Sequence, residues 1–171
     1  NNIVSYINFL IPGIVMTIIF QTSFSHLSEI IISMKQVGSF NDFLSSPISR
    51  EEIYFAFIIS SLLVCIPVCF LNLIVLSFFS NFDKINYISL LYYLIIAIII
   101  FASLGAITGF LSYNWDIQST VSNFFIVPVS LLSGSFFPIE SLNENWKFLF
   151  EYNPIYYLIS GFRGSFVDQF E

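Results

Sequence analysis

The amino-acid sequence predicts an all-α fold, a polytopic transmembrane helical bundle with about four spanning helices and one short re-entrant or interfacial helix. Of its 171 residues 57% are hydrophobic and only 9% are charged, whereas about a quarter of the residues in a soluble domain are charged. The mean hydropathy is +0.86 and Phe supplies 22 residues, which is typical of helices whose solvent is lipid. Apolar runs such as LIIAIIIF do not alternate with polar residues, so they favour helices over the strands of a membrane barrel.

The spanning helices are predicted from stretches that lack Asp, Glu, Lys and Arg. These stretches are Asn1–Ser28, Ile53–Phe82, Ile85–Trp115 and Ile117–Ile139. Each is longer than the roughly 20 residues that a helix needs to cross about 30 Å of hydrocarbon. We therefore expect spanning helices at about 6–28, 53–79, 89–112 and 119–136. No internal repeat or low-complexity linker divides residues 1–171, which predicts a single domain.

The connection between the first two spans, residues 29–52, predicts a compact structured loop. Gly38 is a residue that ends helices, and it follows Lys35 in the last turn of the preceding helix. In SFNDFLSS, the residues Phe40, Phe43 and Leu44 share one helical face, which indicates a short amphipathic helix.

The second half of this connection predicts the start of the next span. Pro47 closes the short helix, and Ser49 with Glu52 fits a capping box at the start of the following one. Arg50 and Glu51 then point into water or toward a partner. Two interpretations stay open: a structural cap of the kind that any membrane helix needs, or a rigid lever that receives force from a soluble partner.

The last predicted span does not continue as a straight helix. Pro128 lies inside it, and Ser133, Gly134 and Pro138 follow, which indicates either a break that leads into a re-entrant element or a simple helix end. The later segment NPIYYLISGF, residues 153–162, is too short to span and predicts an interfacial or re-entrant helix.

Polar and small residues within the spans have two interpretations each. Thr17, Gln21 and Asn72 lie at membrane depth and either line a translocation pathway or form hydrogen bonds between helices. The small-residue stripe GAITG, Gly105–Gly109, marks either packing within the chain or a dimer interface. Arg163 either reaches lipid headgroups or meets an anionic group, such as that of a lipid-linked substrate or of an outer carboxylate.

Composition argues against several functions. A net charge of -6 argues against nucleic acid as a partner. His26 and Glu29 are too few ligands for a metal site, and the single His has no evident nucleophile, so we expect neither a metal nor a catalytic residue. The chain has no phosphate-binding G-x-x-x-x-G-K-[ST] motif, so any ATP would be hydrolysed by another chain. The spans lack an ionisable residue deep in the membrane, which argues against an ion-coupled carrier.

Four motifs, in this order, cover almost the whole chain. They are YINFLIPGIVMTII, GSFNDFLSSPISREEI, LLSGSFFPIESL and YNPIYYLISGFRGSF. Together they resemble the membrane subunit of a type-2 ABC exporter, the class that includes bacterial polysaccharide and drug exporters. One departure is Asn143, which stands where the family often has Pro.

The resemblance implies a permease that moves a lipid, polysaccharide or drug-like substrate outward by alternating access. It implies residues 29–52 in the cytoplasm against a separate ATP-binding cassette subunit, which would hold ATP and Mg, with no cofactor on this chain. It further implies a homodimer or a paired permease in the inner (cytoplasmic) membrane of a bacterial cell. The family has six membrane helices, and residues 1–171 correspond to the second to fifth, a partial transmembrane domain.

The resemblance also implies two functional segments. The expected ATPase-coupling loop contains Gly38, Phe40, Phe43, Leu44, Pro47, Ser49, Arg50 and Glu51. The expected outer re-entrant segment contains Ser133, Gly134, Phe137, Pro138, Asn153, Pro154 and Arg163. Two alternatives from other classes stay open, a membrane anchor or assembly protein without transport activity and a lipid-modifying membrane enzyme.

Overall fold

The structure is a computed structural model that describes residues 2–78, 85–136 and 152–166, with side chains from residue 8 onward and without that of Phe43. Every regular element in these ranges is helical, which confirms the all-α prediction. The elements are α1 (Asn2–Val37), α2 (Phe40–Leu44), α3 (Arg50–Ser77), α4 (Tyr87–Leu111), α5 (Trp115–Val121), η1 (Ser122–Ile126), α6 (Val127–Ser130), η2 (Leu131–Ser135) and α8 (Pro154–Arg163).

Among the described residues, four helices are long and apolar enough to cross a membrane. They cover Asn8–Val37, Arg50–Ser77, Tyr87–Leu111 and Trp115–Ser135, which confirms the predicted spans. The first helix continues beyond residue 28 because neither Pro nor Gly occurs between that residue and Gly38, whose φ of 85° ends α1 as predicted. With 36 residues, α1 is about 54 Å long, so it exceeds the roughly 30 Å of hydrocarbon.

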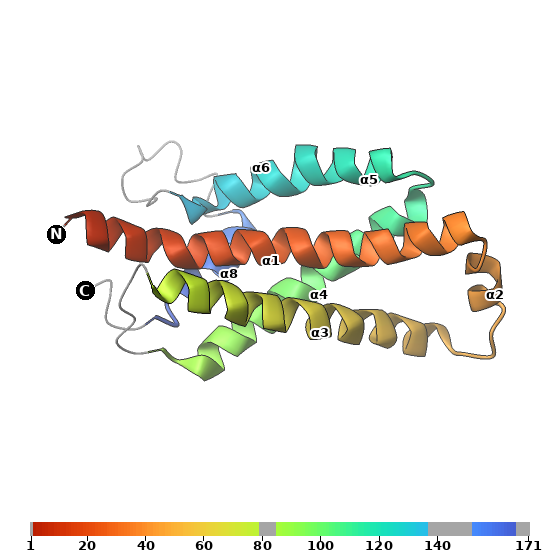
Figure 1. The fold of residues 1–171 in the computed structure, drawn as a ribbon, viewed down its shortest axis with the longest axis horizontal. Helices are drawn as coiled ribbons and strands as arrows, with labels where there is room; N and C mark the ends of the chain where they lie inside the picture. The colour runs from red at the N-terminus through yellow and green to blue at the C-terminus, as the bar shows by residue number, and fades with distance from the viewer. Residues whose placement is uncertain (1, 79–84, 137–151, 167–171) are drawn as a thin grey trace.

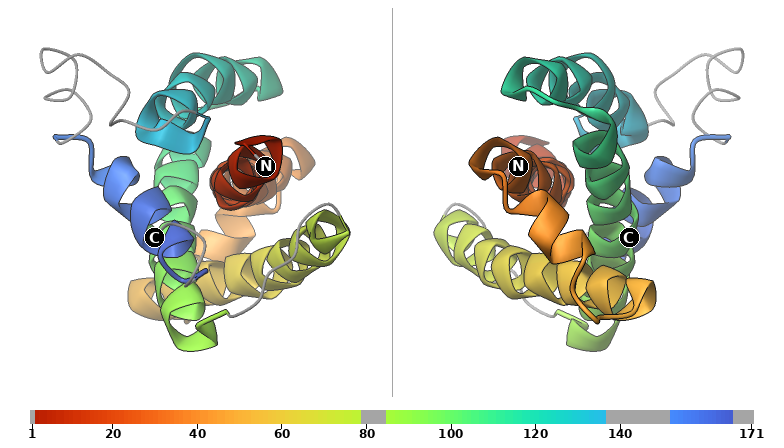
Figure 2. Two further views of the ribbon diagram at one scale, coloured as in Figure 1. Left: turned by 90° about the vertical axis from the view of Figure 1, so that its left-hand side faces the viewer. Right: turned by 90° about the vertical axis from the view of Figure 1, so that its right-hand side faces the viewer.

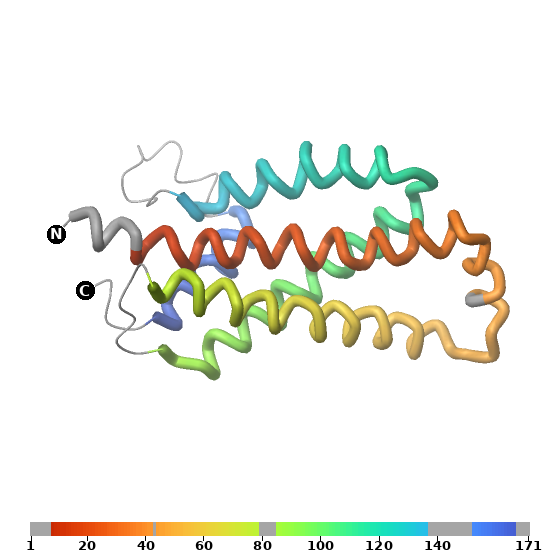
Figure 3. The backbone as a smooth tube through the Cα atoms, viewed as in Figure 1, coloured from red at the N-terminus to blue at the C-terminus, as the bar shows by residue number. Residues whose placement is uncertain are grey.

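Helix α1 forms the centre of the bundle. It runs along the whole length of the fold, with α5 and α6 on one side and α3 on the other (Figure 3). Viewed from the end, α4 and α8 lie on the side of α1 opposite the open face between α3 and α5 (Figure 2). α1 packs against each of these helices and most extensively against α4.

The α1–α4 interface depends on small residues. A Cβ atom at Gly105 would collide with the carbonyl oxygen of Phe24, and one at Gly109 would lie 3.0 Å from the Cα atom of Ser28. Next to this contact, the rings of Phe20 and Phe101 stack with their centroids 4.2 Å apart. The stripe Gly105–Gly109 is therefore an interface within the chain, because α1 already occupies it, and the dimer interpretation of this stripe is wrong.

The fourth span is irregular around Pro128. The π-helical turns η1 and η2 flank the single turn α6, and the N–H of Val127 bonds to the carbonyl of Ser122, five residues back. A wider turn leaves room for the proline ring, which would clash with a carbonyl in a regular α-helix. Pro67, in contrast, lies inside α3, which continues as one helix on both sides of it.

Helix α8 packs onto the end of the bundle that lies opposite α2 (Figure 1). The Asn153 side chain caps it by accepting a hydrogen bond from the Ile155 N–H at 3.0 Å, and Pro154 occupies its first turn. A Cβ atom at Gly161 would overlap the ring of Tyr93, so α8 and α4 are in close contact. The predicted short helix at 153–162 is confirmed, and it lies against α4, α1 and η2.

Candidate functional site: the two ends of the bundle and the polar face of α1

The α1–α3 connection is built from consecutive capping elements. The Ser49 side chain accepts a hydrogen bond from the Glu52 N–H at 3.3 Å, and the Glu52 carboxylate accepts one from the Ser49 N–H at 2.9 Å. This reciprocal pair is the predicted capping box, and it fixes the direction in which α3 leaves the loop. Arg50 and Glu51 are exposed in the first turn of α3.

Helix α2 contacts the bundle through Phe40. The Phe40 ring lies 5.9 Å from the Phe110 ring at the end of α4. Leu44, which was predicted on the same face, is 55% exposed, and the side chain of Phe43 lies outside the described residues. The predicted short helix is therefore confirmed. Of the two described apolar side chains on its predicted face, Phe40 contacts the bundle and Leu44 is largely exposed.

Lys35 forms a set of contacts that the sequence did not predict. Its ammonium group donates hydrogen bonds to the carbonyl oxygens of Gly109, Phe110 and Ser112 at 2.8, 2.6 and 2.9 Å. Although Lys35 lies in the last turn of α1, its ammonium group caps the end of α4. The three carbonyl groups belong to residues more than 70 positions away in sequence, so no local pattern marks them.

A second contact joins the same region. The Trp115 indole N–H donates a hydrogen bond of 2.8 Å to the Gln36 side-chain oxygen, which ties the start of α5 to α1. Beside it lies a pocket of about 340 Å³. Its lining residues are Lys35, Gly38, Phe40, Asn41, Phe110 and Tyr113.

At the opposite end, the break in the fourth span is held by polar side chains. Gly134 has a φ of 74°, and Ser133 also departs from helical geometry, so the helix ends there. The Asn153 side-chain amide donates to the Ser133 hydroxyl at 3.0 Å, and the Arg163 guanidinium donates to the Gly134 carbonyl at 3.0 Å. The structure thus brings Ser133, Gly134, Asn153 and Arg163 together, as expected of one segment.

Arg163 also lies over an aromatic ring of α1. Its Cζ atom is 3.7 Å from the centroid of the Phe9 ring. With the bond to Gly134, this contact gives the guanidinium a role in joining α8, η2 and α1, which neither interpretation of the sequence included. Phe137 and Pro138, also predicted for this segment, lie outside the described residues.

In the described part of the chain, the three predicted pathway residues lie in different surroundings. The Thr17 hydroxyl donates to the Gly13 carbonyl at 2.9 Å and lies 3.3 Å from the Ser135 hydroxyl, so it belongs to the packing of α1 on η2. The Asn72 amide donates to the Val68 carbonyl of its own helix at 2.8 Å. Gln21, in contrast, borders an open pocket of about 330 Å³ on α1.

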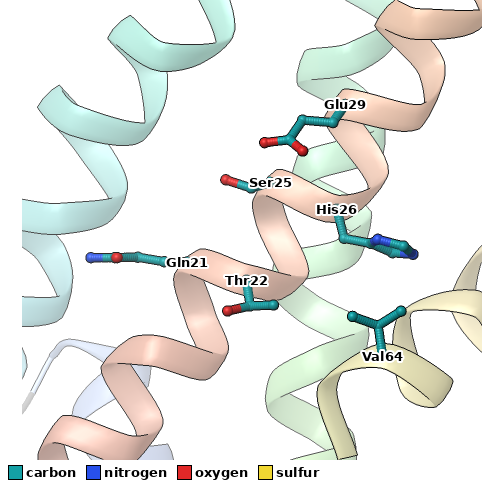
Figure 4. A pocket seen from close by; sticks show the side chains of 6 residues that line it. All are labelled: Gln21, Thr22, Ser25, His26, Glu29 and Val64. Carbon is teal, nitrogen blue, oxygen red and sulfur yellow. The ribbon is translucent and has the colours of Figure 1, made fainter. Parts of the chain in front are cut away.

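This pocket presents a mixed set of polar groups (Figure 4). Its lining residues are Gln21, Thr22, Ser25, His26 and Glu29 of α1 and Val64 of α3. His26 is 3.0 Å from the Ser60 hydroxyl of α3, and the Gln118 amide of α5 donates to the Ser25 hydroxyl at 3.3 Å. The spacing of Gln21, Ser25 and Glu29 at every fourth residue is the sequence signal for this polar face.

The described residues hold no group of three or more His, Cys, Asp or Glu side chains that could bind a metal ion. Cys65 and Cys69 are buried free thiols on α3.

Comparisons with known proteins agree with this architecture. Residues 1–167 match the family model described as ABC-2 type transporter. The chain is 24% identical over 163 residues to the inner membrane transport permease YadH of Escherichia coli strain K12, and likewise to that of Shigella flexneri. The match covers 95% of this chain and 64% of the relatives' length. No solved structure matches the chain. Because the family model covers nearly all of its residues, this multi-pass membrane protein belongs to the ABC-2 type transporter family.

Proposed function

We propose that this chain is the membrane-spanning part of a permease subunit in an ATP-driven exporter. Membership of the ABC-2 family and the similarity to proteins named inner membrane transport permeases support this proposal. The substrate is a lipid, polysaccharide or drug-like molecule that moves outward by alternating access, and the protein resides in the inner membrane of a bacterial cell.

The α1–α2–α3 connection is the observation that carries the proposal. This connection has a defined helix end at Gly38, a short helix α2 and the capping box of Ser49 and Glu52. A connection structured in this way can transmit a movement from a bound partner to α1 and α3, whereas a flexible linker would not. Its exposed surface includes Asp42, Leu44, Arg50 and Glu51, a mixture of apolar and charged groups that suits a protein partner.

We infer that this surface binds a separate ATP-binding cassette subunit, which holds ATP and Mg. The α2 end of the bundle then faces the cytoplasm, and the α8 end, with its break at Ser133 and Gly134, faces outward. When ATP closes a pair of such subunits, α2 moves with them and the spans rearrange.

The polar face of α1 is the best candidate for the translocation surface. It offers an amide, hydroxyl groups, an imidazole and a carboxylate within one open pocket, whereas many large apolar side chains are exposed on the described parts of α3 and α4. Polar groups at membrane depth commonly face a pathway or a helix interface. A second permease subunit, identical or related, would enclose this face and complete the pathway.

Co-purification tests the proposal. The full-length parent protein is expressed with the ATP-binding protein encoded beside it, and the yield of the complex and its ATPase activity are measured. Replacing Arg50, Glu51 and Leu44 by Ser should reduce the yield of the complex, because these side chains are exposed at the α2 end. The matched control is Tyr87→Ser, because Tyr87 is also exposed but lies at the end of the bundle opposite α2. This substitution should leave the complex intact.

If no ATP-binding protein is retained by the parent, the exporter proposal fails. A membrane anchor or assembly protein then becomes the better explanation, because the fold alone is compatible with it. A lipid-modifying enzyme would instead show activity on lipids without any nucleotide.

A further inference from the structure

We propose that Lys35 is a positioning residue that makes α2 and the cytoplasmic end of α4 move as one body. Its role in transport rests on the proposed function, whereas the mechanical connection is a property of the chain itself. Three carbonyl oxygens and two aromatic rings surround its ammonium group.

The hydrogen bonds of Lys35 use its full donor capacity. An ammonium group has three N–H donors, and three carbonyl oxygens, those of Gly109, Phe110 and Ser112, lie within 2.9 Å of the nitrogen. The last carbonyls of a helix lack partners within the helix, and together they carry the negative end of the helix dipole. α4 has no basic residue in its own last turn, so α1 supplies the positive charge that its end needs.

Two aromatic rings extend this contact to α2 and to the α4–α5 connection. The Lys35 nitrogen lies 5.5 Å from the centroid of the Phe40 ring and 5.2 Å from that of the Tyr113 ring. Phe40 also contacts the Phe110 ring, so it touches both the lysine and the last turn of α4. Phe40 of α2 is thereby joined to α1 through the Lys35 ammonium group, which also binds the end of α4.

These contacts connect a movement of α2 to α4 and α5. A displacement of α2 presses Phe40 against Lys35 and Phe110, and Lys35 holds the end of α4 through three hydrogen bonds. The bond between Gln36 and Trp115 continues this connection to the start of α5. Movement at α2 therefore reaches the fourth span as well as α1.

The chemistry of lysine suits this position. Its compact ammonium group can direct three donors at three neighbouring carbonyls, whereas the planar guanidinium of arginine spreads its donors in one plane. Lys35→Met keeps most of the apolar length but removes the charge and every donor. Lys35→Arg keeps the charge and should therefore retain more of the connection between α2 and α4 than Lys35→Met does.

The first experiment measures the connection in the permease alone. Spin labels are placed at Asp42→Cys on α2 and Leu111→Cys at the end of α4, both exposed, in a full-length parent that has Ala at positions 65 and 69 and is reconstituted in lipid nanodiscs. In the wild type, the distances between the two labels should form one narrow distribution. In Lys35→Met, this distribution should become broad or split into several maxima. Gln36→Ala, which removes the neighbouring bond to Trp115 but leaves α2 untouched, is the matched control and should keep the narrow distribution.

The second experiment measures coupling in the complex with the ATP-binding subunit. The factor by which the permease changes ATPase activity, normalised to the amount of assembled complex, should fall by about fivefold or more in Lys35→Met, as expected when coupling between two sites is lost. A purely structural role would lower the yield of complex and leave this normalised factor unchanged. The wild-type Asp42–Leu111 label distance should stay the same when the subunit is trapped with ATP and vanadate.

Three outcomes would overturn the inference: a narrow distribution in Lys35→Met, a label distance that changes on nucleotide trapping in the wild type, or an unchanged normalised factor. If no ATP-binding subunit associates, the proposed function fails, and the first experiment still decides whether Lys35 joins α2 to α4.

Discussion

Adding a single methyl group at Gly105 should destabilise the bundle, because α1 and α4 touch there through backbone atoms. A Cβ atom at this position would overlap the Phe24 carbonyl, and the neighbouring carbonyl carbon would lie 2.9 Å away, well inside the usual carbon–carbon separation of about 3.5–4.0 Å. The backbone of α1 cannot rotate away as a flexible side chain would, so the two helices must separate.

The expected magnitude follows from two opposing effects. Overpacking a tight interface costs about 1–3 kcal/mol, whereas replacing Gly by Ala inside a helix stabilises it by about 1 kcal/mol. Gly105→Ala should therefore lower the free energy of unfolding by up to about 2 kcal/mol. The net loss should be smaller in Gly109→Ala, where the nearest atom would be 3.0 Å from the new Cβ.

Gly164 provides the matched control. A Cβ atom there would meet only the carbonyl oxygens of Gly161 and Ser160 at 3.5 Å, an ordinary contact, and its φ of -61° suits any residue. Gly164→Ala should therefore be neutral or slightly stabilising. The assay is thermal unfolding of the full-length parent in detergent, followed by the loss of the folded peak in size-exclusion chromatography. A Gly105→Ala protein at least as stable as Gly164→Ala would refute the packing described for α1 and α4.

Three further predictions concern single side chains. Ser49→Ala should cost about 1 kcal/mol of stability in the same assay, because the cap of α3 is lost, and an unchanged melting temperature would argue against the capping box. Arg163→Met should increase hydrogen–deuterium exchange in residues 131–136 and 154–163, because the bond to the Gly134 carbonyl is removed, whereas exchange in α2 should stay the same. Asn72→Leu should leave ATPase activity in the complex unchanged, because within the described residues the Asn72 amide bonds to the Val68 carbonyl of its own helix, and a clear loss of activity would favour a place for Asn72 in the pathway.

Local features of this fold are predictable from the sequence because they depend on neighbouring residues. Charge-free runs predict the four spans, since a charged group in hydrocarbon is costly. The capping box of Ser49 and Glu52 and the helix end at Gly38 depend on residues within one turn of each other.

The arrangement of the helices is not predictable in the same way. Lipid and protein core are both apolar, so the composition of a helix face does not show whether it meets a neighbour or the bilayer. The sequence therefore did not predict that α1 is central, and it left open whether the stripe at Gly105–Gly109 binds α1 or a second subunit.

The polar contacts that define the two ends were missed for a related reason. Lys35 pairs with carbonyls 74 to 77 residues away, and Arg163 pairs with a backbone oxygen 29 residues away. A carbonyl group occurs at every residue, so no residue type marks it as a partner. The sequence likewise did not identify the partner of Thr17, since its contact with Ser135 joins residues 118 positions apart.

The most direct test of the account is a cross-linking measurement at the two ends of the bundle. A photoreactive group is placed at Asp42 on α2, or at Tyr87 near α8 as the control, in the full-length parent expressed with the ATP-binding protein encoded beside it. If α2 is the coupling element, light should cross-link the ATP-binding protein to position 42 and not to position 87. Cross-linking at position 87 alone, or at neither position while the complex is intact, would contradict the claim that α2 is the coupling element.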